Sequence, residues 1–157
     1  MPIVREFDGP LVDVGSGGGA PGIPLAASLP EREVTLLEAK RRKVEFLEQW
    51  ARELPNLRVV WGRAEEQETD RFGVAVAKAL APPAVALEWC LPLVSPGGAA
   101  ILWVGESADS ATLASVAEQI GGAEPELRAG LLVVRKLDAT PARFPRRVGA
   151  ARKRPLA

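Results

Sequence analysis

The chain lacks several residue types that enzymes often use in catalysis. Its 157 residues include no histidine, no tyrosine and a single cysteine, Cys90. The absence of histidine excludes an imidazole general base and a Ser–His triad, and one thiol can form neither an internal disulfide nor a cysteine-rich metal cluster. We therefore expect no bound metal. Any chemistry has to come from carboxylates, from positioning or from a cofactor.

The chain also lacks long hydrophobic runs. No apolar run approaches the roughly 18 residues that a membrane span needs, and the first residues, MPIVRE, form no signal-peptide core. Hydrophobic residues make up 47% of the chain and charged residues 25%, as in soluble globular proteins. At this length we expect one folded domain that acts as a monomer in the cytoplasm, away from membranes.

The net charge is zero, but the charges are unevenly distributed. Six basic residues and no acidic residue lie between positions 139 and 157, so residues 1–138 carry a net charge of −6. This segment contains three prolines and shows no strand or helix pattern. We interpret residues 1–138 as the folded domain and residues 139–157 as a basic C-terminal tail. The tail either contacts a polyanion or is a solvated, disordered terminus.

A glycine cluster near the N-terminus is the most specific motif. Residues 11–26 read LVDVGSGGGAPGIPLA, an apolar run that leads through Asp13 into four glycines within five positions. This pattern is typical of a parallel strand that ends in a nucleotide-binding turn. The D-x-G-x-G form over 13–17 is usual in S-adenosylmethionine (SAM) methyltransferases. Residues 17–22 also satisfy G-x-G-x-x-G, so a dinucleotide remains an alternative ligand.

Strand and helix patterns alternate along the chain. An antiparallel pair without an intervening helix closes the series, with a turn at Ala129-Gly130. Together the patterns predict an α/β fold with a doubly wound, Rossmann-like, mostly parallel sheet and the terminal antiparallel hairpin of SAM methyltransferases. We expect strands at 10–13, 33–38, 57–61, 72–77, 99–104, 124–128 and 131–136, and helices at 23–28, 43–54, 83–93 and 108–120.

Ligands of such sheets bind beyond the carboxyl ends of the strands. The end of the second strand carries Glu38, 25 residues after Asp13, and a carboxylate there can accept hydrogen bonds from both ribose hydroxyls. The third and fourth strand ends supply further candidates, near the adenine and the methyl donor respectively. We expect the cofactor contacts to be Asp13, Gly15, Ser16, Gly17, Gly18, Gly22, Glu38, Ala39, Ala64, Glu65 and Lys78.

A run of four cations, KRRK over 40–43, opens the second predicted helix. Positive charge at a helix N-terminus opposes the helix dipole. The run therefore indicates either contact with an anion or a solvated helix face.

Several segments together resemble one family, RsmG (GidB). They are DVGSGGGAPGIPLA (13–26), VTLLEAKRRKVEFLE (34–48), GRAEE (62–66), CLPLVSPGG (90–98), and TPARFPRR with ARKRPL (140–147, 151–156). The resemblance runs from about residue 10 to residue 156. It implies a bacterial enzyme that uses SAM to methylate N7 of a guanine in 16S rRNA of the small ribosomal subunit.

The resemblance also implies roles for particular residues. It places the SAM loop at 15–22, the ribose carboxylate at Glu38 and the adenine contacts at Ala64 and Glu65. Guanine N7 carries a free lone pair and no proton, so its methylation needs no base, in keeping with the absence of histidine. We expect Arg63 and Lys78 to be the catalytic residues on the substrate side, and Arg143, Phe144, Arg146, Arg147 and Arg152 to contact RNA.

Two alternative functions remain open. In the first, the chain is a reduced module that binds SAM and the ribosome with little turnover. Two departures from the family favour it: a short segment before Pro10, and Val104 in place of a lysine. A third departure is Lys78, where the family usually has an arginine. In the second, the chain is a small-molecule methyltransferase or an NAD enzyme, which would not require a basic tail.

Overall fold

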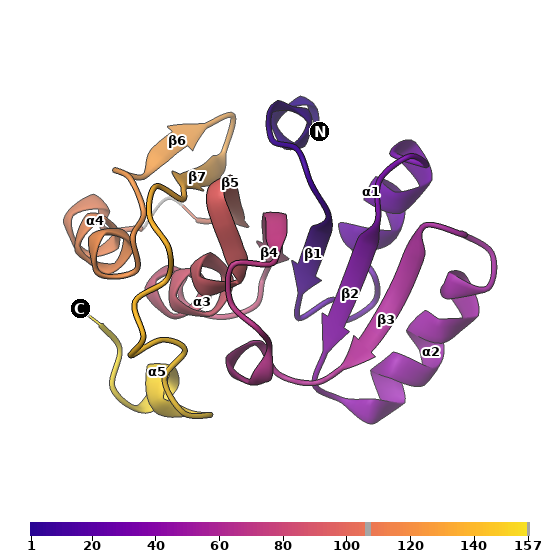
Figure 1. The fold of residues 1–157 in the computed structure, drawn as a ribbon. Helices are drawn as coiled ribbons and strands as arrows, with labels where there is room; N and C mark the ends of the chain where they lie inside the picture. The colour runs from indigo at the N-terminus through magenta and orange to yellow at the C-terminus, as the bar shows by residue number, and fades with distance from the viewer. Residues whose placement is uncertain (106–107, 157) are drawn as a thin grey trace.

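The computed structural model describes residues 1–105 and 108–156 and contains one seven-stranded sheet (Figure 1). The strand order is β3-β2-β1-β4-β5-β7-β6, in which β1 to β5 are parallel and β7 is antiparallel to both of its neighbours. The sheet therefore has the predicted doubly wound topology with its terminal hairpin. The strands are β1 (Leu11–Val14), β2 (Val34–Glu38), β3 (Leu57–Trp61), β4 (Phe72–Lys78), β5 (Val94–Trp103), β6 (Glu126–Arg128) and β7 (Leu131–Arg135).

Helices cover both faces of the sheet. The elements α1 and α2 pack on one face, and α3 and α4 pack on the other. None of the helices in the described part of the chain has the length and apolar character to cross a membrane. The α-helices are α1 (Gly22–Ser28), α2 (Arg41–Ala51), α3 (Pro83–Cys90), α4 (Ser110–Gln119) and α5 (Ala150–Lys153), and the 3-10 helices are η1 (Pro2–Glu6), η2 (Ala64–Glu66) and η3 (Leu91–Leu93).

The middle of the central strand β4 is apolar because both of its faces are buried. In β4, Val74 and Val76 join the core on the α1 side, whereas Ala75 and Ala77 join the core on the α3 side. All four side chains are at most 1% exposed. Successive side chains of a strand point to opposite faces, so a strand between two helical layers needs apolar residues at every position. This double burial holds the carboxyl ends of β1 and β4 in fixed positions.

The terminal hairpin forms as the sequence predicts. Its turn residues Ala129 and Gly130 have φ angles of 50° and 78°. Two consecutive residues with positive φ match the right-handed twist of the flanking strands. The hairpin places β7 beside β5, with Ile101 opposite Val133.

Several predicted elements differ from the structure in their bounds; helix α2, for example, spans Arg41–Ala51 rather than 43–54. Strand β5 begins at Val94 rather than at 99, and the register with β4 shifts between Phe72 and Val74, so the Ser-Pro-Gly-Gly segment is part of an irregular strand. Helix α3 ends at Cys90 and continues as a 3-10 turn, because Pro92 has no backbone N–H to extend the α-helix.

The C-terminal segment was expected to lack regular structure, but it is ordered against the body of the protein. It contains α5, and its Phe144 and Ala151 side chains are 5% and 2% exposed. The anchoring contacts, described below, come from residues distant in sequence, and no local pattern reports them. The last residue of the predicted tail, 157, lies outside the described residues.

Candidate functional site

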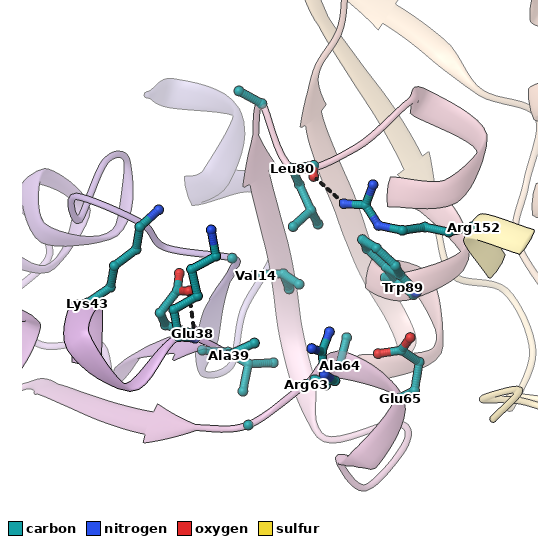
Figure 2. A pocket seen from close by; sticks show the side chains of 15 residues that line it. Val14, Glu38, Ala39, Lys43, Arg63, Ala64, Glu65, Leu80, Trp89 and Arg152 are labelled. Atoms are coloured by element: carbon teal, nitrogen blue, oxygen red, sulfur yellow. Dashed lines mark hydrogen bonds between the residues drawn. The ribbon is translucent and has the colours of Figure 1, made fainter. Parts of the chain in front are cut away.

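A pocket of about 340 Å³ lies at the carboxyl ends of the parallel strands (Figure 2). Four strand ends contribute to its wall, through Gly15 after β1, Ala39 after β2, Gly62 after β3 and Leu80 after β4. The volume is in the range of small-molecule and cofactor sites. Its position is the one that the strand-end rule predicts for a nucleotide-like ligand.

Gly15, the first residue of the glycine loop, lines the pocket. Gly15 has a φ of +70°, and a Cβ at this position would collide with the side chain of Leu80. Glycine is required here because it tolerates positive φ and leaves room for a neighbour. The backbone N–H of Gly17 donates a hydrogen bond of 2.8 Å to Oε2 of Glu38, which ties the loop after β1 to the end of β2.

Glu38 has the geometry expected of a ribose ligand. Its side chain lines the pocket although the residue is only 6% exposed. The carboxylate is held by two backbone donors: Gly17 N–H bonds to Oε2, and Lys40 N–H bonds to Oε1 at 3.0 Å. Each carboxylate oxygen has two lone pairs, so one on each oxygen remains for a hydroxyl of a ligand. The residues present therefore fit the ribose of SAM.

Asp13 supports the glycine loop from inside the protein rather than from the pocket wall. The residue is 1% exposed, and its Oδ2 accepts a hydrogen bond of 3.0 Å from Gly22 N–H. Ser16 is also buried, and its hydroxyl donates to the backbone carbonyl of Asp13. Oδ1 of Asp13 has no partner among the described residues, and burial raises the pKa of this carboxyl to about 7. These residues close the loop onto the start of α1.

The segment after β3 forms the opposite wall. Arg63, Ala64 and Glu65 all line the pocket, as the strand-end rule predicts. The segment is fixed locally, because Arg63 N–H donates a hydrogen bond of 3.1 Å to Oε2 of Glu66. Oε1 of Glu65 accepts a bond of 3.4 Å from Gly149 N–H, so this wall is also joined to the C-terminal segment.

At the end of β4, the pocket lining begins one residue after the predicted contact, Lys78. Lys78 is exposed and is not part of the pocket lining, whereas the next residues, Ala79 and Leu80, are. Extending the strand-end rule by two positions would have found them. Gly17, Gly18 and Gly22 likewise do not line the pocket.

Sequence reasoning missed other wall residues that come from outside the strand ends. Trp89 belongs to α3, Lys43 belongs to α2, and Arg152 reaches the pocket from α5. Lys43 belongs to the cationic run noted in the sequence. Trp89 carries no local signal, because only the packing of α3 on the sheet brings it to the pocket.

Two of the expected RNA contacts have structural roles instead. The ring of Phe144 is buried in the core on the α3 side, so it has no free face for a base to stack on. The guanidinium of Arg146 forms two hydrogen bonds of 2.6 Å to the carboxylate of Glu88, a residue that is 4% exposed. Arg143 and Arg147, by contrast, are exposed.

Comparisons with known proteins agree with this geometry. Residues 1–122 match the family model GidB, described as rRNA small subunit methyltransferase G. The chain is 35% identical to the ribosomal RNA small subunit methyltransferase G of Synechococcus elongatus, over 98% of this chain and 72% of that protein. It is 38% identical to the protein of the same name from Thermotoga neapolitana, over 99% of this chain and 76% of that protein.

Solved structures with the same fold are more distant in sequence. A TehB-like SAM-dependent methyltransferase from Corynebacterium glutamicum aligns with a TM-score of 0.61 at 20% identity, over 83% of this chain and 80% of that one. A SAM-dependent O-methyltransferase from Thermotoga maritima aligns with a TM-score of 0.70 at 12% identity, over 89% and 64% of the two chains. These likenesses establish the fold. The family match and the relatives establish that the chain belongs to the rRNA small subunit methyltransferase G family.

Proposed function

We propose that this chain transfers a methyl group from SAM to N7 of a guanine in the 16S rRNA of the small ribosomal subunit. Membership of the family supports the reaction and the substrate. The pocket supports the cofactor, because the buried carboxylate of Glu38 faces a ligand-sized space beside a glycine loop. When bound, SAM supplies an electrophilic methyl group on a sulfonium, and the protein supplies alignment.

The residues of this chain have distinct parts in the proposed reaction. Glu38 binds the ribose, and the wall at Ala39, Ala64 and Glu65 encloses the adenine. The target guanine needs no base, because its N7 lone pair is free in the neutral nucleoside. This agrees with a pocket whose lining contains no histidine, cysteine or tyrosine.

Two cations are candidates for the substrate side. Arg63 lines the pocket, and Lys78 is exposed at the end of β4, next to the pocket residues Ala79 and Leu80. A guanidinium or an ammonium in these positions can contact a phosphate or the O6 of guanine. We expect Arg63→Ala and Lys78→Ala to lower methylation of saturating RNA substrate. Unchanged rates in both variants would remove these residues from the mechanism.

Binding of the ribosomal RNA is assigned to the exposed part of the C-terminal segment. Arg143 and Arg147 are exposed, and the segment carries no acidic residue after Asp138. Affinity for RNA falls as the salt concentration rises, and each phosphate contact that is lost should reduce the magnitude of the slope of log affinity against log salt by about 1. The double variant Arg143→Gln/Arg147→Gln should therefore bind small subunits more weakly and with a lower salt dependence. An unchanged slope would exclude both residues.

The direct test of the proposed function is methyl incorporation from labelled SAM into unmethylated small ribosomal subunits. Naked 16S rRNA is the parallel substrate, and nucleoside mass spectrometry identifies the product. We expect 7-methylguanosine. Binding of SAM without incorporation into either substrate would contradict the proposal and favour a module with little turnover.

One copy of the chain contains the whole pocket, which supports a monomer acting where ribosomes are, in the cytoplasm.

A further inference from the structure

The C-terminal segment supplies a cation to the cofactor pocket. Arg152, in α5, lies with its guanidinium carbon 5.1 Å from the centre of the Trp89 ring (Figure 2). Its Nη2 donates a hydrogen bond of 3.4 Å to the backbone carbonyl of Leu80, and Arg152, Trp89 and Leu80 all line the pocket. Stacking of this kind holds a guanidinium in one orientation while leaving other donors free.

The place of Arg152 in the pocket distinguishes it from the other cations there. Lys40 and Lys43 come from the segment after β2, and Arg63 comes from the segment after β3. Because β4 lies beside β1 on the side away from β2 and β3, Leu80 and Arg152 form the opposite end of the site. Among the described residues, Arg152 is the cation that lines the end of the pocket next to β4.

The orientation of the cofactor follows from Glu38. If this carboxylate holds the ribose at the end of β2, the adenine extends toward β3, and the methionine part extends past Gly15 toward the end of β4. The methionine part carries a carboxylate, and an arginine is the side chain best suited to bind a carboxylate through two parallel hydrogen bonds. The acidic residues of the pocket lining have backbone partners elsewhere: Glu38 accepts from Gly17 and Lys40, and Glu65 accepts from Gly149.

We propose that Arg152 binds the methionine carboxylate of SAM, so that the C-terminal segment is a wall of the cofactor site. This inference rests on the proposed function, since it requires that the pocket takes SAM. It assigns Arg152 to the cofactor rather than to RNA.

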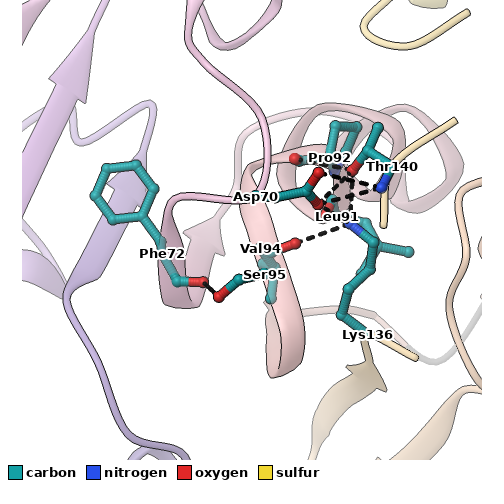
Figure 3. Close-up of polar contacts among 8 residues, drawn as sticks. All are labelled: Asp70, Phe72, Leu91, Pro92, Val94, Ser95, Lys136 and Thr140. Atoms are coloured by element: carbon teal, nitrogen blue, oxygen red, sulfur yellow. Dashed lines mark hydrogen bonds and ion pairs between the residues drawn. The ribbon is translucent and has the colours of Figure 1, made fainter. Parts of the chain in front are cut away.

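A buried lysine positions the segment that carries Arg152 (Figure 3). Lys136 is 1% exposed, and its Nζ donates to Oδ1 of Asp70 at 3.0 Å and to Oγ1 of Thr140 at 2.7 Å. The same Nζ also bonds to the carbonyls of Leu91 and Val94, at 3.0 and 2.8 Å. This ammonium therefore joins the start of the C-terminal segment to β7, η3 and the loop before β4.

Two further anchors lie between Thr140 and α5. The Arg146–Glu88 pair attaches the segment to α3, and the Gly149–Glu65 bond attaches it to the wall after β3. Arg152 follows Gly149 by three residues. These anchors hold Arg152 at the pocket before any ligand binds, and a preorganised contact costs less ordering on binding.

The test compares two ligands that differ in the carboxylate alone, SAM and decarboxylated SAM, by calorimetry. Arg152→Gln should lower the affinity for SAM about tenfold to a hundredfold, which is the loss expected for a hydrogen bond between charged groups. It should leave the affinity for decarboxylated SAM unchanged. The matched control is Lys153→Gln, which removes a neighbouring charge of α5 and should weaken neither ligand.

Each other result overturns the inference in a distinguishable way. An equal loss of affinity for both ligands would show that Arg152 only shapes the pocket. No loss for either ligand would favour the original prediction that Arg152 contacts RNA. If Lys43→Gln lowered the affinity for SAM alone and Arg152→Gln left both affinities unchanged, the carboxylate would be assigned to Lys43. Failure of the unmodified protein to bind either ligand would contradict the proposed function itself.

A double-mutant cycle tests the positioning by Lys136. Thr140→Val removes the hydroxyl that links the segment to the lysine, and it should weaken SAM more than decarboxylated SAM. In the Arg152→Gln background the same change should have no selective effect, because the carboxylate contact is already lost. Additive effects in the cycle would show that Thr140 contributes to stability alone.

Discussion

Asp13 gives this protein a pH dependence of stability with an unusual sign. Its carboxyl is 1% exposed, and burial raises its pKa from 3.8 to about 7. Below about pH 4, Asp13 is protonated in both the folded and the unfolded chain. Between about pH 4 and pH 7, the unfolded chain has released this proton whereas the folded chain retains it, so the free energy of unfolding falls as the pH rises. Above about pH 7, Asp13 causes no further change.

The size of this effect follows from the two pKa values. A change from 3.8 to about 7 corresponds to about 4 kcal/mol in total. About 3 kcal/mol of this falls between about pH 4.5 and about pH 7.5. Asp13→Asn removes the titration while keeping an oxygen that can accept the hydrogen bond from Gly22 N–H.

The assay is chemical denaturation of the wild type and of Asp13→Asn at several pH values across this range. Other groups titrate in both proteins, so their contributions cancel in the difference between the two free energies of unfolding. We expect the wild type to lose about 3 kcal/mol relative to the variant between about pH 4.5 and about pH 7.5. Parallel stability curves would refute the reasoning, because they would show that Asp13 ionises normally in the folded protein.

Three further predictions concern the buried polar contacts. Lys136→Met leaves the Asp70 carboxylate without its cation. We expect the free energy of unfolding, measured by chemical denaturation, to fall by about 3–5 kcal/mol. A fall below about 1 kcal/mol would contradict the structural role of Lys136. Arg146→Gln should cost about 3 kcal/mol at neutral pH, and combining it with Glu88→Gln should restore part of this loss, since the unpaired buried charge is then absent. Glu38→Gln should lower the affinity for SAM about tenfold or more in calorimetry. A change in the thermal midpoint without a change in this affinity would show that Glu38 does not bind the ribose.

Local patterns were sufficient for the elements around the glycine loop. The run from Leu11 to Gly22 predicted a strand, a turn and a helix, and the structure confirms β1 and α1 there. The strand at 57–61 has the predicted bounds. Prediction succeeded because an apolar run between turn residues is a property of consecutive positions. The strand-end rule also predicted Glu38, Ala39, Arg63 and Ala64 at the ligand site, and all four line the pocket.

The same rule misassigned residues whose side chains point away from the pocket. Asp13 and Ser16 lie at a strand end, but both face the protein interior and hold the loop. Lys78 ends β4 on the exposed side, and the pocket begins one residue later. Position along the chain therefore predicts the right segment, whereas the direction of each side chain depends on the packing around it.

The sequence by itself determined the α/β architecture and the glycine loop and predicted Glu38 at the pocket wall, because these follow from patterns of consecutive residues and from the strand-end rule. Only the tertiary structure decided the role of the C-terminal segment. Its basic composition predicted either a tail that contacts a polyanion or a disordered terminus. In the structure Lys136 and Glu88 fix the segment to the body, and Phe144 is buried. These partners are distant in sequence, and only the folded sheet brings them together. The same folding brings Arg152 to the pocket at the strand ends.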